Sequence, residues 1–327
     1  MALRQEDEIP SMSLQDYAER FTLLRVSGPH KVCMLLAVLD LARAGLLRQN
    51  RIVYGPALLE RYFGFFQAVR QPQQHPNPNF PFFFLKGVLR NGQASFWHLQ
   101  PIPGRALELA AMTTAPSPSA ILNNIACATL DEALFDLLQA PESIDALGDA
   151  LARHWFRQGL SDLDAAVRAA TQISRYERVL RDEPPLTAEE PPPKAVRDPA
   201  FRRVVLDSYD YRCAATGLRV VLNDNTEAMV EAAHIVPFSE SQDDDPRNGI
   251  ALTPNMHWAM DRNLIAPGPD FLWHVSSALD DRIPDFRAFA ELSGRRLFKP
   301  GDARRMPRQD ALGWRLDRLR DPAWRAQ

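Results

Sequence analysis

Three polar side chains in the last third of the chain, His234, Asn248 and His257, are the residues best suited to chemistry. Imidazoles titrate near neutral pH, so they can accept a proton from water or bind a metal ion. The amide of Asn248 is uncharged and can hydrogen-bond through both of its ends. These residue types can activate a water molecule and stabilise negative charge that develops in a reaction.

Two acidic residues, Asp261 and Glu231, are candidate partners of this chemistry. Asp261 follows His257 by four residues, so in a helix the two side chains share one face. Glu231 shares one side of a predicted strand with Ala233, because side chains alternate along a strand. Asp261 could ligate a metal ion or hold the imidazole of His257, and both roles stay open. Such oxygen and imidazole donors suit Mg²⁺, Mn²⁺ or a similar divalent ion.

Residues 200–264 resemble the HNH endonuclease family. The resemblance is carried by Val230–Pro237 (VEAAHIVP) and by Pro246–Asp261 (PRNGIALTPNMHWAMD). It implies a β-hairpin followed by a helix around one metal ion, which is the ββα-metal fold. We therefore expect a C-terminal nuclease domain whose substrate is double-stranded DNA.

The resemblance also implies residue roles. His234 is the general base, Asn248 orients the hairpin loop and the base, and His257 is a metal ligand. Many family members place an aspartate or histidine ligand directly before the base, where this chain has Ala233. Glu231 is the candidate to replace that ligand.

A second departure concerns zinc. Many family members bind a structural zinc through two CxxC pairs, which read Cys213/Thr216 and Thr253/Met256 here. We therefore expect one divalent metal ion, no structural zinc, and Cys213 in the core. An inactive HNH scaffold in a DNA-binding protein remains an alternative, supported by Ala233.

The first half of the chain reads as mainly helical. Apolar spacing predicts helices over 31–45, with Gly45 as a stop, and over 56–66. The segments 80–85 and 95–99, separated by Asn91-Gly92, predict a β-hairpin. The predicted fold class is α+β: a mainly helical DNA-reading domain with a β-hairpin wing, followed by the ββα-metal nuclease domain.

Residues 25–180 are similar to the sulfur-binding domains. The similarity lies in Gly28–Asp40 (GPHKVCMLLAVLD), Asn50–Tyr54 (NRIVY) and Phe80–Leu85 (FPFFFL). Those domains recognise phosphorothioated DNA, and they occur fused to HNH nucleases in McrA-type, modification-dependent (type IV) restriction enzymes. The resemblance implies a role in defence against foreign DNA.

Carried over by motif, Phe80, Pro81 and Phe84 form the sulfur cavity, and His30 and Lys31 meet the DNA backbone or a base. Sulfur is larger and more weakly hydrated than oxygen, so a shallow apolar cavity can favour it. This chain departs from the family in having Phe80 for a tyrosine and Phe84 for a small residue. A different modification, such as a methylated or hypermodified base, therefore stays open.

The net charge of −3 over 327 residues argues against a nucleic-acid partner only as an average. Eleven basic and two acidic residues lie between Arg20 and Arg105, and eleven basic and five acidic residues lie in 286–327. Such segregation suits an anionic polymer.

A Pro-rich segment predicts a linker at 182–196 between a reading domain (1–181) and a nuclease domain (197–327).

The chain has three cysteines and no CxxC pair, which fits a reducing compartment. Its N-terminus is acidic, and it has no long apolar run. We therefore expect a soluble, cytoplasmic protein with no membrane partner. A homodimer stays open, because double-strand cutting by one-metal sites often needs two copies. The acidic run Asp243–Asp245 is expected to form a solvated loop.

Overall fold

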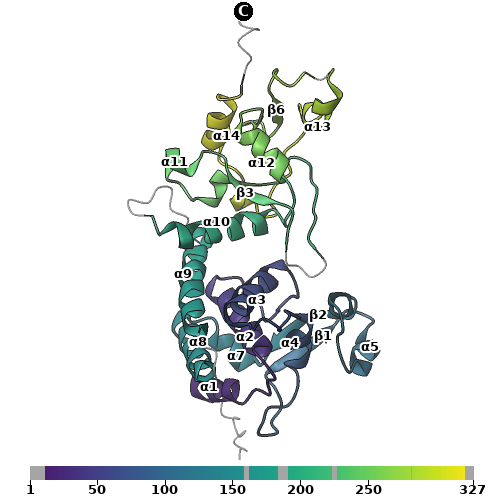
Figure 1. The fold of residues 1–327 in the computed structure, drawn as a ribbon, viewed down its shortest axis with the longest axis vertical. Coiled ribbons are helices and arrows are strands. Elements are labelled where there is room, and N and C mark those ends of the chain that lie inside the picture. Colours follow the sequence, from purple (N-terminus) through teal and green to yellow (C-terminus); the bar gives the residue numbers. More distant parts are fainter. Residues whose placement is uncertain (1–11, 158–161, 183–190, 223–226, 281, 321–327) are drawn as a thin grey trace, which may run out of the picture. The chain divides into compact units, whose positions relative to one another are not determined.

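The computed structural model describes residues 12–157, 162–182, 191–222, 227–280 and 282–320. The chain forms two compact units, the N-terminal unit (1–171) and the C-terminal unit (172–327), each with its own hydrophobic core (Figure 1). The boundary falls inside helix α9, and much of the predicted linker lies outside the described residues. The predicted domain limits therefore stay a prediction, whereas the α+β fold class is confirmed.

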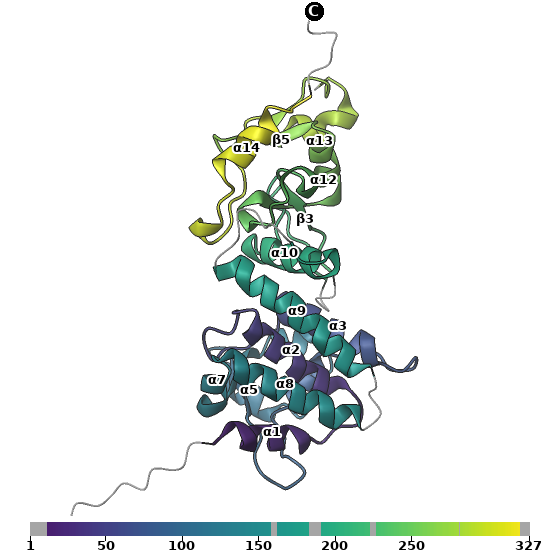
Figure 2. The same ribbon diagram turned by 90° about the vertical axis from the view of Figure 1, so that its left-hand side faces the viewer.

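The N-terminal unit is mainly helical. Its elements are α1 (Leu14–Thr22), α2 (His30–Arg43), α3 (Pro56–Val69), α4 (Asn79–Phe84), β1 (Trp97–Pro101), α5 (Ala106–Ala111), α6 (Pro118–Leu122), β2 (Ile125–Leu130), α7 (Glu132–Leu137), α8 (Pro141–Phe156) and the first part of α9 (Leu163–Asp182). Helices α3, α4 and α8 pack against α2. Helix α1 packs against α8, and Figure 2 shows these two helices next to each other. None of the helices within the described residues is both long and apolar enough to cross a membrane.

Helix α2 lies at the centre of this unit because it is apolar around almost its whole circumference. It ends where the backbone N–H groups of Gly45 and Leu46 donate to the carbonyls of Ala42 and Leu41, each at 3.0 Å. This ending needs a left-handed residue, which Gly45 supplies with a φ of 74°. The predicted helix and its stop at Gly45 are confirmed.

The β-hairpin predicted over 80–85 and 95–99 is wrong. Residues 79–84 are helical, and the two-stranded sheet of this unit is instead formed by β1 and β2. These strands run antiparallel, with Trp97 opposite Leu130. The wing therefore exists, but its second strand comes from a part of the chain that the sequence did not point to.

Packing explains why the phenylalanine run is a helix. Phe82 and Phe83 are buried in the core, whereas Phe80 and Phe84 are each 37% exposed on the opposite side. Exposure at positions four apart is a helical pattern, since an alternating strand would place residue 82 beside residues 80 and 84. The strand preference of phenylalanine is weak enough for this tertiary packing to override it.

The C-terminal unit places small strands among helices. Its elements are the second part of α9, α10 (Lys194–Ser208), β3 (Glu231–His234), α11 (Phe238–Ser241), β4 (Gly249–Leu252), α12 (Pro254–Asp261), β5 (Ile265–Pro267), β6 (Trp273–Val275), α13 (Arg287–Ala290), α14 (Gln309–Leu316) and short 3₁₀ turns at Pro246–Asn248, Pro284–Phe286 and Ala303–Arg305. The pairs β3–β4 and β5–β6 are antiparallel. Helix α10 packs on β3 and β4, and α12 follows β4 directly.

Candidate active site

The strand β3, the 3₁₀ turn that leads into β4, and the helix α12 carry all five residues that the sequence singles out for catalysis and metal binding. The register places Glu231 opposite Leu252 and His234 opposite Gly249. Gly249 allows α10 to approach closely, because a Cβ there would lie 2.4 Å from the side chain of Val205. A side chain larger than hydrogen at this position would force the hairpin away from α10.

Asn248 is fully buried and closes the loop between the two strands. Its Oδ1 accepts from the backbone N–H of Val236 at 2.9 Å, and its Nδ2 donates to the carbonyls of Val236 and Asp243 at 3.0 and 3.1 Å. A charged side chain could not satisfy both donors and acceptors here. Within the described residues the amide contacts the loop backbone and makes no hydrogen bond to the His234 ring.

His234 ends strand β3 and faces α10. Its ring stacks on Phe201 with the centroids 3.9 Å apart and the planes 1° from parallel. Its Nε2 lies 3.1 Å from Oδ1 of Asp244, while Nδ1 makes no hydrogen bond to any residue that the structure describes. The side chain is 21% exposed, so it is held in place and still reachable by water.

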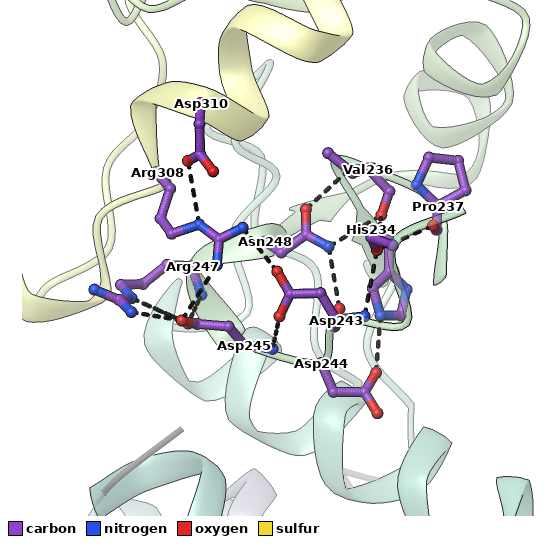
Figure 3. Close-up of polar contacts among 11 residues, drawn as sticks. His234, Val236, Pro237, Asp243, Asp244, Asp245, Arg247, Asn248, Arg308 and Asp310 are labelled. Carbon is purple, nitrogen blue, oxygen red and sulfur yellow. Dashed lines mark hydrogen bonds and ion pairs between the residues drawn. The ribbon is translucent and has the colours of Figure 1, made fainter. Parts of the chain in front are cut away.

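The acidic run that we expected to be a solvated loop is buried, which corrects that expectation. Figure 3 shows its polar contacts. Asp243 and Asp244 are each 3% exposed, and Asp245 is not exposed at all. Three arginines partner them, with Arg308 2.7 Å from Asp243, Arg197 3.2 Å from Asp244, and Arg247 3.0 Å from Asp245. Two of these arginines lie far away in the sequence, so the pairing is a tertiary feature. Burial raises the pKa of the Asp243 carboxyl against the opposing effect of the neighbouring Asp245 N–H and Arg308.

On the other side of β3, the structure brings Glu231, His257 and Asp261 together, and we call them the histidine–carboxylate cluster. Nδ1 of His257 lies 2.8 Å from Oε2 of Glu231, and its Nε2 lies 3.5 Å from Oδ2 of Asp261. The predicted i,i+4 pairing on one helix face and the predicted orientation of Glu231 are both present. The side chains are 27% to 55% exposed, so the cluster is open to solvent.

The donors of the histidine–carboxylate cluster suit a divalent ion by their chemistry, since one imidazole and two carboxylates can share it with water. Among the described residues, however, no three His, Cys, Asp or Glu side chains are already arranged as a metal site. In the structure each ring nitrogen of His257 faces a carboxylate instead. Metal binding by this cluster is therefore a proposal.

Because side chains alternate along β3, His234 and the histidine–carboxylate cluster lie on opposite sides of the strand. Glu231 and Ala233 face α12, whereas His234 faces α10. The buried Ala233 offers no donor to join them.

In the N-terminal unit, the five residues carried over from the sulfur-binding resemblance all line one pocket of about 420 Å³, which we call the aromatic pocket. The rings of Phe80 and Phe84 stack along one of its walls, 6.2 Å apart and 17° from parallel. His30 and Lys31 come from the first turn of α2. His30 also has a structural contact, because its Nε2 lies 3.0 Å from the carbonyl of His75.

Sequence reasoning missed several lining residues of the aromatic pocket, including Arg25, Gly28 and Asn77. Burial and the neighbouring Arg25 lower the pKa of the Lys31 ammonium group. Two cations that line the same partly apolar pocket favour an anionic ligand, which would relieve their repulsion. Arg25 could have been suspected, since it lies only a few residues before the quoted motif.

The C-terminal unit thus has a hairpin and a helix that present an imidazole, a buried amide and a histidine flanked by two carboxylates. Residues 213–266 match the family model described as "HNH endonuclease". The chain therefore contains an HNH endonuclease domain. Cys213, expected in the core, is fully buried there.

Among solved structures, one named "Modification dependent TagI restriction endonuclease" is similar over 41% of this chain and 40% of that chain, with 18% sequence identity. Its TM-score of 0.29 is too low to define a shared fold. The region of similarity covers less than half the length of that protein. No curated protein matches this chain significantly.

Proposed function

We propose that the protein is a metal-dependent endonuclease that hydrolyses phosphodiester bonds of modified DNA, in defence against foreign DNA. The HNH domain cuts, and the N-terminal unit selects the DNA. The observation that carries the proposal is the HNH match over residues 213–266, which include His234 at the end of β3 and Asn248 in the loop that follows it.

The proposed roles follow from the contacts. His234 removes a proton from the attacking water through Nδ1, the ring nitrogen that Asp244 leaves free. Asn248 fixes the loop that carries the base. Glu231, His257 and Asp261 would hold the divalent ion, which supplies stabilisation of the charge on the phosphate and on the leaving oxygen.

Metal dependence is testable through Glu231. We expect Mn²⁺ or Mg²⁺ to support cleavage of duplex DNA and a chelator to stop it. Replacing Glu231 with glutamine removes one charged donor, so the Mn²⁺ concentration for half-maximal cleavage is expected to rise about 10- to 100-fold.

The matched control is Glu240→Gln, because Glu240 is an exposed glutamate of α11 in the same unit. It should leave the Mn²⁺ titration unchanged. Equal Mn²⁺ requirements for Glu231→Gln and the wild type would remove Glu231 from the ligand set.

For the DNA, we propose that the aromatic pocket receives a phosphorothioate group. Phe80, Pro81 and Phe84 offer an apolar wall to the weakly hydrated sulfur, and Arg25 and Lys31 offer positive charge to its phosphate. The basic segment that contains these residues would contact the neighbouring phosphates.

One observation favours a second candidate, a reader of a modified base. Phe84 replaces the small residue of the sulfur-binding family, and its exposed, stacked partnership with Phe80 provides a flat apolar surface. Bases stack readily on such surfaces. A panel of phosphorothioated, methylated and hydroxymethylated duplexes, each compared with the unmodified duplex at one salt concentration, separates the two candidates.

A further inference from the structure

We propose that Asp244 is the positioning residue of the base: it fixes the His234 ring with Nδ1 free, and Arg197 and Tyr176 in turn fix Asp244. This inference rests on the proposed function of His234. It assigns a role in the reaction to a carboxylate in the loop that the sequence suggested was only solvated.

Asp244 is well suited to hold another group because it is itself immobilised. Its Oδ1 lies 3.1 Å from Nε2 of His234 and accepts from Nη1 of Arg197 at 3.2 Å. Its Oδ2 accepts from the hydroxyl of Tyr176 at 3.4 Å. The carboxylate is therefore held from three sides, by α10, by α9 and by the end of β3 (Figure 3 shows its contact with His234).

The partners of Asp244 all act as donors. Burial and the charge of Asp244 raise the pKa of Tyr176, so its phenol keeps its proton and donates it. Arg197 is anchored as well, because its guanidinium lies 3.4 Å above the centre of the Phe238 ring. A carboxylate surrounded by donors can only accept from His234, so the Nε2 of that ring carries hydrogen.

Phe201 completes the arrangement. The parallel contact of its ring with His234 prevents the imidazole from tilting, while the hydrogen bond to Asp244 prevents it from turning over. These two contacts fix the direction in which the lone pair of Nδ1 points, so that it can accept a proton from a water molecule. When the O–H bond of the attacking water breaks, the proton goes to Nδ1, and Asp244 stabilises the resulting positive ring without taking a proton itself.

The structure offers a matched pair of variants. Asp244→Asn keeps the shape of the side chain and removes its charge. Asp198→Asn removes the other carboxylate that Arg197 contacts, at a side chain that is 44% exposed and makes no contact with His234 within the described residues. Each variant therefore removes the charge of one carboxylate that pairs with Arg197. Only Asp244→Asn also changes the partner of His234.

The direct measurement is NMR of the full-length protein with ¹⁵N-labelled histidine. We expect one Nε2–H proton that is shifted downfield and protected from exchange with water, and that is missing in His234→Ala. It should move upfield in Asp244→Asn and stay in place in Asp198→Asn. An Nδ1-protonated His234 in the wild type, or an unchanged resonance in Asp244→Asn, would overturn the proposal, and the wild-type spectrum decides even if the variant does not fold.

Kinetics separate a positioning role from a merely structural one. In Asp244→Asn, kcat for duplex cleavage is expected to fall about 30-fold with KM within a factor of two, since only the base is affected. Asp198→Asn should retain wild-type kcat. If the wild type itself cuts no DNA, the proposed function fails, and the NMR measurement still decides whether Asp244 positions the ring.

Discussion

Replacing His234 with alanine is expected to lower the rate of duplex cleavage about 1,000-fold, because the variant has no group to accept the proton of the attacking water. The fold should survive, since the His234 side chain is partly exposed and its loss leaves Asn248 and its three loop hydrogen bonds intact. The measurement is the rate of nicking of a plasmid at saturating Mn²⁺, together with a thermal melt.

His274 is the matched control for this variant. It lies in the same unit and is also paired with an aspartate, with its Nε2 3.1 Å from Asp270, yet it belongs to β6, outside the HNH hairpin. His274→Ala should cut at the wild-type rate. Cleavage by His234→Ala at the wild-type rate would show that the base is another residue.

The second large effect is expected in the aromatic pocket. Replacing Arg25 and Lys31 together with alanine removes both of its cations, and we expect the affinity for phosphorothioated duplex to fall about 100-fold. The slope of log affinity against log salt should become shallower by about one for each lost phosphate contact. Binding is measured with the full-length His234→Ala protein, so that the DNA remains uncut.

Arg105→Ala provides the comparison, because Arg105 is a half-exposed cation of the same unit that does not line the aromatic pocket. It should change the affinity by less than a factor of two. An Arg25/Lys31 double variant that binds as tightly as its parent at matched salt would place the DNA on another surface.

Local rules predicted the parts of the site that depend on a single element. The four-residue spacing on α12 was enough to place Asp261 beside His257, and alternation along β3 predicted which side of the strand Glu231 occupies. The contact of Glu231 with His257 depends in addition on the packing of α12 against β3. The helix at 31–45 was equally predictable, since its apolar run and the glycine that ends it lie next to each other in the sequence.

Features that depend on distant residues could not be predicted in this way. Asp244 is buried beside Arg197 of α10 and Tyr176 of α9. No local sequence pattern predicts that these residues come into contact. The segment that begins at Phe80 was assigned wrongly as a strand. Its strand preference is overridden because Phe82 and Phe83 pack into the core of the N-terminal unit, which distant segments of the chain form.

Cleavage of a plasmid that carries phosphorothioate groups, compared with the same plasmid without them, tests the central claim most directly. The full-length protein with Mn²⁺ should cut the phosphorothioated plasmid at least ten times faster than the unmodified one, and His234→Ala should cut neither. Equal cutting of the two plasmids would contradict sulfur recognition. Failure to cut either, with metal present and the protein folded, would contradict the nuclease itself.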